Sequence, residues 1–338
     1  MNVMVEGLLV DGLPRTHPVI ARPRDTKLRV GTRASPLALV QTRAFLKMLS
    51  GFCPVLREMD VFEEHAITTT GDAIQDRRLA DIGGKGLFAK EIHEALLDHR
   101  IDFAVHSLKD LETELPPGVV LACTLKREDA RDVLILGPNC GVPDPINPFA
   151  ALAKGALVGT SSVRRQAQLL HARPDLRVEA IRGNVQTRLG KLSAGQYDAS
   201  LLALAGLRRL NLDPPNAIVL EPDFMIPAAA QGIVGVTARA SDVALLHLLA
   251  AIEDPEARAV STAERSMLAE LDGSCRTPIG GYARLLPDGR LMLTGMVARA
   301  DGSFLMTRDL IARACDAERM GQTLGTSLRA DAPVDIFG

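Results

Sequence analysis

Apolar and polar positions follow two different periods along this chain. From residue 28 to about residue 205, short apolar runs typical of buried strands alternate with stretches whose apolar positions recur every three or four residues, as in helices. The expected strands lie at 28–32, 101–107, 156–160, 177–181 and 197–205, and the expected helices at 35–49, 87–99, 162–172 and 184–195. This alternation predicts α/β layers with largely parallel strands.

The order of elements changes beyond about residue 255. A long helical pattern at 254–271 precedes three alternating strands around 279–312 and a final helix, which is typical of a small α+β domain. The Pro/Gly-rich stretch 137–148 is the best candidate for a linker or excursion between the first two lobes. A chain of 338 residues is long enough for two or three domains.

The composition narrows the class of protein. The formal net charge is −2 and no basic stripe carries interleaved aromatics, so we expect no nucleic-acid partner. No run of 18 uncharged apolar residues occurs, so we expect no contact with a membrane. The first 26 residues do not resemble a signal peptide, and we interpret them as a flexible extension.

The cysteines and histidines argue against disulfides and metals. The five cysteines are odd in number and contain no C-x-x-C pair, which indicates a reducing, cytoplasmic location (Cys53, Cys123, Cys140, Cys275 and Cys315). The seven histidines show no H-x-x-x-H or H-E-x-x-H spacing, so no metal site is expected.

Arginines gather where three expected strands turn into helices. Each turn offers a helix cap, namely Ser35, Ser162 or Asn184, and helix amino termini favour anions. The arginines near these caps are Arg33 at the first turn, Arg164 and Arg165 at the second, and Arg182 and Arg188 at the third. Guanidinium groups suit carboxylates and phosphates, so the pattern predicts a cleft for a ligand with several anionic groups.

Three further stretches could carry chemistry. The expected strand 101–107 delivers Lys109 and Asp110 at its carboxyl end, where open α/β sheets bind ligands. The stretch "GKGLFA" is a poor dinucleotide fingerprint, and we interpret it as backbone near a ligand that Lys85 and Phe88 face. Cys275 lies in a tight turn beside Arg276, which favours an accessible, ionisable thiol.

Seven motifs together closely resemble the porphobilinogen deaminase family, also called hydroxymethylbilane synthases: "GTRASPLAL", "IGGKGLFAKEI", "VHSLKDL", "GTSSVRRQAQL", "RGNVQTRLGKL", "PAAAQGIVG" and "DGSCRTPIGGYA". They follow the family order over about residues 28–285. The resemblance implies an enzyme of tetrapyrrole and haem biosynthesis. It would couple four porphobilinogen molecules into hydroxymethylbilane, release ammonia, and extend a covalently attached dipyrromethane cofactor.

The resemblance also implies the architecture. Two α/β lobes like those of periplasmic binding proteins would flank a cleft, beside a small C-terminal α+β domain. We expect the first lobe to comprise 27–132 and 229–246, the second 133–228, and the C-terminal domain 247–338. The protein would be a cytoplasmic monomer.

The family's functional positions transfer onto matching residues of this chain. The resemblance implies that Asp110 is catalytic and that Cys275 holds the cofactor through a thioether. The further cofactor-binding residues would be Lys109, Ser107, Thr160, Ser162, Arg164, Arg165 and Arg188. The substrate-binding residues would be Arg33, Ser35, Phe88, Arg182, Gly183 and Gln231, the last near a crossing between the lobes.

Two other classes of protein stay open on the residues alone. A non-catalytic, two-lobed anion-binding module would explain the arginines equally well and would not need Asp110 or Cys275. A hydrolase with Cys275 as nucleophile and His106 as base is the other alternative, although a histidine at a strand end is more often structural. Release of ammonia from porphobilinogen would separate these classes.

Overall fold

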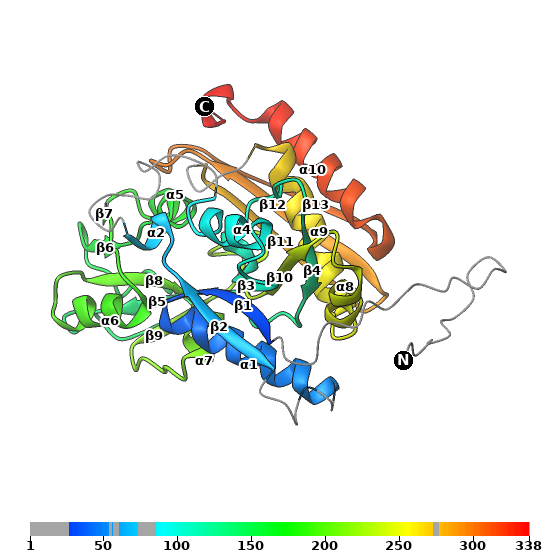
Figure 1. The fold of residues 1–338 in the computed structure, drawn as a ribbon. Helices are drawn as coiled ribbons and strands as arrows, with labels where there is room; N and C mark the ends of the chain where they lie inside the picture. Colours follow the sequence, from blue (N-terminus) through cyan, green and yellow to red (C-terminus); the bar gives the residue numbers. More distant parts are fainter. Residues whose placement is uncertain (1–26, 54–55, 57–60, 74–85, 273–276, 338) are drawn as a thin grey trace, which may run out of the picture.

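The computed structural model describes residues 27–53, 56, 61–73, 86–272 and 277–337 (Figure 1). Their strands form two five-stranded sheets and one three-stranded sheet. The extension 1–26, Lys85 and Cys275 lie outside the described residues. No helix in the described ranges combines the length and hydropathy needed to cross a bilayer.

The first sheet has the strand order β2-β1-β3-β10-β4. Successive residues of β3 face opposite sides, since Phe103 and Val105 pack with α1 and α8 whereas Ala104 packs with α4. The elements are β1 Leu28–Arg33, α1 Pro36–Phe52, β2 Phe62–Ile67, α2 Thr70–Ala73, α4 Lys90–Leu97, β3 Phe103–Ser107, a 3-10 turn Leu108–Asp110, β4 Val119–Thr124, β10 Val234–Arg239 and α8 Val243–Ala250.

The second sheet has the order β7-β6-β8-β5-β9. It is also covered on both faces, because Leu201 and Leu202 of β8 belong to different apolar clusters. The elements are β5 Asp132–Leu136, β6 Leu157–Gly159, α5 Val163–Ala172, β7 Arg177–Glu179, α6 Val185–Ser193, β8 Ala199–Ala203, α7 Leu204–Arg209 and β9 Ala217–Leu220.

Each of these sheets contains one strand that opposes the other four, β10 in the first and β5 in the second. These are the strands that follow the two crossings between the lobes. The crossing segments run side by side, with Leu125 N–H bonding Val234 O at 2.9 Å and Glu128 N–H bonding Gly232 O at 3.0 Å. A chain that crosses the cleft enters the next sheet at its carboxyl edge and therefore runs against its neighbours. The expectation of largely parallel strands thus holds apart from these two.

Composition indicated the wrong stretch for the linker between the lobes. The Pro/Gly-rich stretch 137–148 follows β5 and precedes β6, so it is an excursion within the second lobe. The crossing itself falls before Asp132, where extended chain leads straight into β5 and has no need of turn residues.

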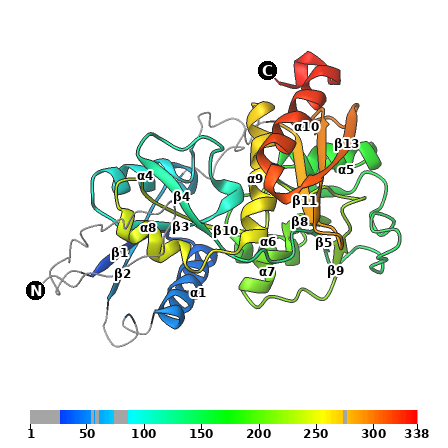
Figure 2. The same cartoon turned by 90° about the vertical axis from the view of Figure 1, so that its right-hand side faces the viewer.

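The third sheet, β11-β12-β13, forms the C-terminal α+β unit with α9 and α10. The two helices approach closely because Gly321 has no side chain, and a Cβ atom there would lie 2.3 Å from Ala263 O. In Figure 2 the first sheet lies on one side of the molecule, and the second sheet and the C-terminal unit lie on the other. The elements are α9 Pro255–Glu270, β11 Ile279–Leu285, β12 Arg290–Ala298, β13 Leu305–Arg313, a 3-10 turn Ala314–Asp316, α10 Ala317–Asp331 and a 3-10 turn Val334–Ile336.

This architecture confirms the predicted fold class of two α/β lobes and a small C-terminal α+β domain. The helix starts expected at Ser35, Ser162 and Asn184 are confirmed as caps, each accepting a backbone N–H of the following turn. The residue bounds of the three domains stay a prediction.

Candidate active site

A cavity of about 660 Å³ lies where the carboxyl ends of the strands of both lobes meet. Residues that follow β1, β2 and β3 line it from the first lobe, and residues that follow β6, β7 and β8 line it from the second. In open α/β sheets this edge is the usual place for a ligand. The lining includes Arg33, Ser35, Asp72, Phe88, Ser107, Lys109, Asp110, Ser162, Arg164, Arg165, Arg182, Gly183, Arg188, Gln231 and Thr277.

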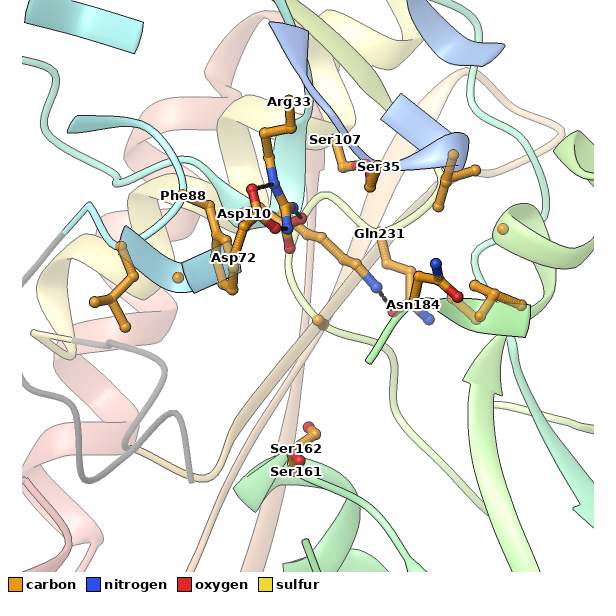
Figure 3. A pocket seen from close by; sticks show the side chains of 18 of the residues that line it. Arg33, Ser35, Asp72, Phe88, Ser107, Asp110, Ser161, Ser162, Asn184 and Gln231 are labelled. Atoms are coloured by element: carbon orange, nitrogen blue, oxygen red, sulfur yellow. Dashed lines mark hydrogen bonds and ion pairs between the residues drawn. The ribbon is translucent and has the colours of Figure 1, made fainter. Parts of the chain in front are cut away.

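Arg33 is the centre of the first lobe's wall (Figure 3). Its Nε donates to Asp72 Oδ2 at 3.1 Å, a second bond joins Nη2 to Asp72 Oδ1, and Nη1 reaches Asp110 Oδ2 at 3.4 Å. The guanidinium also lies 4.2 Å from the centre of the Phe88 ring. Burial alone would lower the pKa of Arg33, but the bond to Asp72 and the charges of Asp110 and Asp72 raise it.

Lys109 and Asp110 face the cavity from one turn of 3-10 helix, not from the strand itself. The strand β3 ends at Ser107, and the 3-10 turn then directs Lys109 Nζ to Gln231 Oε1 at 3.1 Å while Asp110 meets Arg33. Burial, with the charge of Arg165, lowers the pKa of Lys109 to about 8. The cation and the anion are therefore held apart, because Lys109 bonds Gln231 and Asp110 bonds Arg33.

Asp132 organises the second lobe's arginines. This fully buried carboxylate accepts bonds from Arg164 Nη2 at 2.7 Å, Arg165 Nη2 at 2.7 Å and Gln231 Nε2 at 2.9 Å. Burial alone would raise the pKa of Asp132, but the charges of Arg164 and Arg165 hold it well below its usual range. The same Gln231 accepts from Lys109, so one continuous network joins the crossing segments and both lobes.

Arg182 and Arg188 bring two further positive charges to the second lobe's wall, and each also bonds a backbone carbonyl. Arg188 Nε donates to Gly183 O at 2.9 Å and Arg182 Nη2 to Gly71 O at 3.2 Å, which are neutral acceptors. Burial, with the charges of Arg165 and Arg182, lowers the pKa of Arg188 to about 10. Gly183 itself has φ +109°, a backbone conformation that favours glycine at this turn.

The hydroxyl residues Ser107 and Thr160 differ in their position relative to the cavity. Ser107 lines it and donates its Oγ–H to Gln41 Oε1 at 3.1 Å. Thr160 lies behind the wall, buried, with Oγ1 accepting from Ser162 N–H at 3.2 Å. Thr277, two residues beyond Cys275, lines the cavity, whereas Cys275 itself lies outside the described residues.

Sequence reasoning missed two carboxylates. Asp72 follows β2 at the same sheet edge as Arg33, but β2 was not among the expected strands, so the signal that "TTGD" follows a strand was missed with it. Asp132 begins β5, and a charged residue opening an apolar run gives no local indication of which cations it will meet. Both become visible only when strands far apart in the sequence come together.

His106 does not have the environment of a general base. Its Nε2 lies 2.9 Å from Thr237 Oγ1 within the first lobe, and burial, with the charges of His93 and Arg33, lowers its pKa to about 3. This fits the structural interpretation of His106 and gives no support to a cysteine-histidine hydrolase.

The charge balance of the cavity defines its ligand. Six of the described lining residues carry cations and three carry carboxylates. This excess of cations, some of which also bond backbone carbonyls, suits a group with several carboxylates. A dipyrromethane bearing acetate and propionate groups fits this donor set.

Fold and site together define a two-lobed protein that binds a small polycarboxylate next to a fixed aspartate. The family model "Porphobilinogen deaminase, dipyromethane cofactor binding domain" matches residues 28–247, and "Porphobilinogen deaminase, C-terminal domain" matches residues 258–330. The chain belongs to the porphobilinogen deaminase family.

Similar proteins cover nearly the whole chain. The porphobilinogen deaminase of Paracoccus denitrificans is 47% identical over 92% of this chain and 96% of its own length. The chloroplastic porphobilinogen deaminase of Oryza sativa subsp. japonica is 47% identical over 84% of this chain and 77% of its own. Among solved structures, an arginine-specific periplasmic binding protein of Salmonella typhimurium matches 67% of this chain and 91% of its own at 15% identity, with a TM-score of 0.36.

Proposed function

We propose that this chain joins four porphobilinogen molecules head to tail into hydroxymethylbilane, as a monomer in the cytoplasm, with release of one ammonia at each addition. One observation carries the proposal. Asp110 projects from the 3-10 turn after the central strand β3 into a cavity whose other charged groups are mainly cations. A carboxylate placed there can stabilise positive charge on a ligand whose own carboxylates are held elsewhere.

The cations and caps around Asp110 would bind the carboxylates of the primer and the substrate. When bound, the dipyrromethane cofactor supplies the pyrrole ring to which the first substrate is joined. We assign its binding to Cys275 through a thioether and to Ser107, Lys109, Thr160, Ser162, Arg164, Arg165 and Arg188. We assign the incoming substrate to Arg33, Ser35, Phe88, Arg182, Gly183 and Gln231.

Asp110 would act on the reacting atoms of the substrate. Each addition breaks the bond between the substrate's methylene carbon and the nitrogen of its protonated aminomethyl group, and the nitrogen keeps the bonding electrons and leaves as ammonia. Positive charge then develops on the substrate's pyrrole, and Asp110 stabilises it by accepting the ring N–H. A carbon–carbon bond forms between that methylene carbon and the free α-carbon of the chain, whose proton Asp110 can accept. The bond from Arg33 to one oxygen of Asp110 orients the carboxylate for both tasks.

Turnover of porphobilinogen by Asp110→Ala and Asp110→Glu tests this assignment. We expect Asp110→Ala to lower the rate of ammonia release by at least about 10²-fold, as for loss of a group that stabilises transition-state charge, and Asp110→Glu to keep part of the rate. The cyclised product, uroporphyrin, gives an independent readout. Near-wild-type turnover by Asp110→Ala would contradict the role of Asp110.

Intact mass provides the control for this experiment. Under denaturing conditions that keep thioethers, wild type and Asp110→Ala should both carry the excess mass of one dipyrromethane, and Cys275→Ser should lack it. A non-catalytic anion-binding module would show neither the excess mass nor ammonia release in any variant.

A further inference from the structure

The short helix α2 contacts arginines from both lobes. On the first lobe, the Asp72 carboxylate accepts two bonds from the Arg33 guanidinium, one of them from Nε at 3.1 Å. On the second lobe, Arg182 Nη2 donates to the carbonyl of Gly71 at 3.2 Å. A helix of the first lobe thus bonds two side chains that face the cavity from opposite walls.

The position of Asp72 is built into the first lobe. Thr69 Oγ1 donates to Asp72 Oδ2 at 2.8 Å, and Gly71 N–H donates to Leu87 O at 2.8 Å. The fit is tight, because a Cβ atom at Gly71 would lie 2.4 Å from the Phe88 ring. Phe88 in turn lies against Arg33, so helix, ring and guanidinium form one packed group.

The Asp72 carboxylate occupies the same edge of Arg33 that a ligand carboxylate would use. Bonds from Nε and one Nη to two carboxylate oxygens are the geometry in which arginine binds carboxylates most specifically. The third nitrogen, Nη1, is directed to Asp110. A ligand carboxylate therefore cannot make the two-bond contact with that edge of Arg33 while Asp72 holds it.

We propose that Asp72 is an internal counter-ion that competes with a substrate carboxylate for Arg33, so that each incoming pyrrole must displace Asp72 to be bound. This inference rests on the proposed function, in which the competing group is the acetate or propionate of a pyrrole. Such competition weakens the binding of a pyrrole at Arg33 and makes its exchange easier. A site that binds one pyrrole after another gains from this, because a pyrrole held too tightly there would not move on.

Equilibrium binding of an unreactive pyrrole tests the competition directly. The probe carries acetate and propionate but has a methyl group in place of the aminomethyl group, so it cannot lose ammonia. We expect the Asp72→Asn holoenzyme to bind this probe about 5- to 10-fold more tightly than wild type, and its KM for porphobilinogen to fall more than kcat changes. Asp98→Asn, at an exposed ion pair with Arg100, is the matched control and should leave binding unchanged.

Two further variants separate competition from a merely structural effect. In the Arg33→Gln background, Asp72→Asn should no longer tighten binding, because nothing is left to compete for. Thr69→Val removes the hydroxyl that orients Asp72 without changing any charge, and it should tighten binding in the same direction by a smaller factor.

The outcomes distinguish this inference from the proposed function. Equal or weaker binding by Asp72→Asn, with normal probe binding and turnover in wild type, would overturn the competition alone. A gain that persists in Arg33→Gln would also overturn it. Absence of both probe binding and turnover in wild type would instead overturn the proposed function.

Discussion

The two walls of the cavity hold their arginines in different ways. In the second lobe, Arg164 and Arg165 share Asp132, a carboxylate with no exposed surface, and both guanidiniums are almost fully buried. In the first lobe, Arg33 pairs with Asp72, and 22% of the Arg33 side chain and 24% of the Asp72 side chain are exposed. Asp72 lies on a helix of only four residues.

This difference in burial indicates that the two carboxylates, Asp132 and Asp72, have different roles although each pairs with arginine. A buried pair is costly to break because the remaining charge is left without solvent or partner, so Asp132 fixes the arginines in place. A partly exposed pair contributes little to stability and can be exchanged for a ligand carboxylate. We therefore expect Arg164 and Arg165 to hold a resident polyanion and Arg33 to receive and release one.

Substitution of Asp132 and of Asp72 should give the largest difference in stability between the two walls. Asp132→Asn leaves two buried guanidiniums without their anion, and we expect it to lower the free energy of unfolding by about 3–5 kcal/mol. Asp72→Asn, the same substitution at a partly exposed pair, should lower it by about 1 kcal/mol or less. Urea denaturation of the two variants measures both. Similar losses in the two variants would show that the walls are not built differently.

Acidification should destabilise the first lobe more than the second, by a smaller amount than the substitution of Asp132. Burial lowers the pKa of His93 to about 4, and burial with the charges of His93 and Arg33 lowers that of His106 to about 3, both within the first lobe. Below the unfolded value near 6.5, the unfolded chain takes up protons that the folded lobe excludes. Each histidine should therefore lower the free energy of unfolding by about 1.4 kcal/mol for each unit by which the pH falls between about 6.5 and 4.

Hydrogen exchange measures this loss lobe by lobe. The pKa of Asp132 is lowered, so its stabilisation is lost progressively only below about pH 4, and the second lobe should keep its protection at pH 5. Amides of β3 and α4 should lose protection first. The His93→Phe variant should reduce the effect, since within the described ranges His93 Nε2 is buried without a hydrogen-bond partner. Equal loss in both lobes would contradict this explanation.

Substitution of the helix caps Ser35 and Ser162 should give the smallest difference in stability between the lobes, because the two caps make the same hydrogen bond. Ser35 Oγ accepts from Ala38 N–H at 3.3 Å and Ser162 Oγ from Arg165 N–H at 3.4 Å. Ser35→Ala and Ser162→Ala should each cost about 1 kcal/mol of unfolding free energy. The exposed Ser193 provides the control, Ser193→Ala. A much larger cost at one cap would reveal a further structural role there.

Much of this arrangement can be predicted from local patterns. Alternation of strands and helices, a Ser or Asn cap before three of the helices, and arginines at those turns correctly predict α/β lobes and a group of cations at the strand ends. The position of Asp110 at the edge of the sheet can be predicted because β3 is a short apolar run whose carboxyl end is unambiguous. These features depend on neighbours in the sequence, which the sequence displays directly.

The partners of the charged residues could not be predicted in this way. Asp132 lies 32 and 33 positions from its arginines, and Gln231 lies 122 positions from Lys109. Only the order of strands in each sheet brings them together. The Pro/Gly-rich stretch 137–148 was a wrong candidate for the linker for a related reason: glycine and proline mark turns, whereas the crossing before Asp132 is extended and leads directly into β5.

The antiparallel pairing of β4 with β10 has a consequence for biosynthesis on the ribosome. These neighbouring strands would form a simple hairpin if the second lobe were not inserted between them. The first lobe therefore lacks its β10 strand until residue 239 has been made, whereas the strands of the second lobe are all made by residue 220. Chains generally fold domain by domain from the amino terminus during synthesis. Here we expect the reverse: the lobe that begins the chain is completed after the lobe that interrupts it.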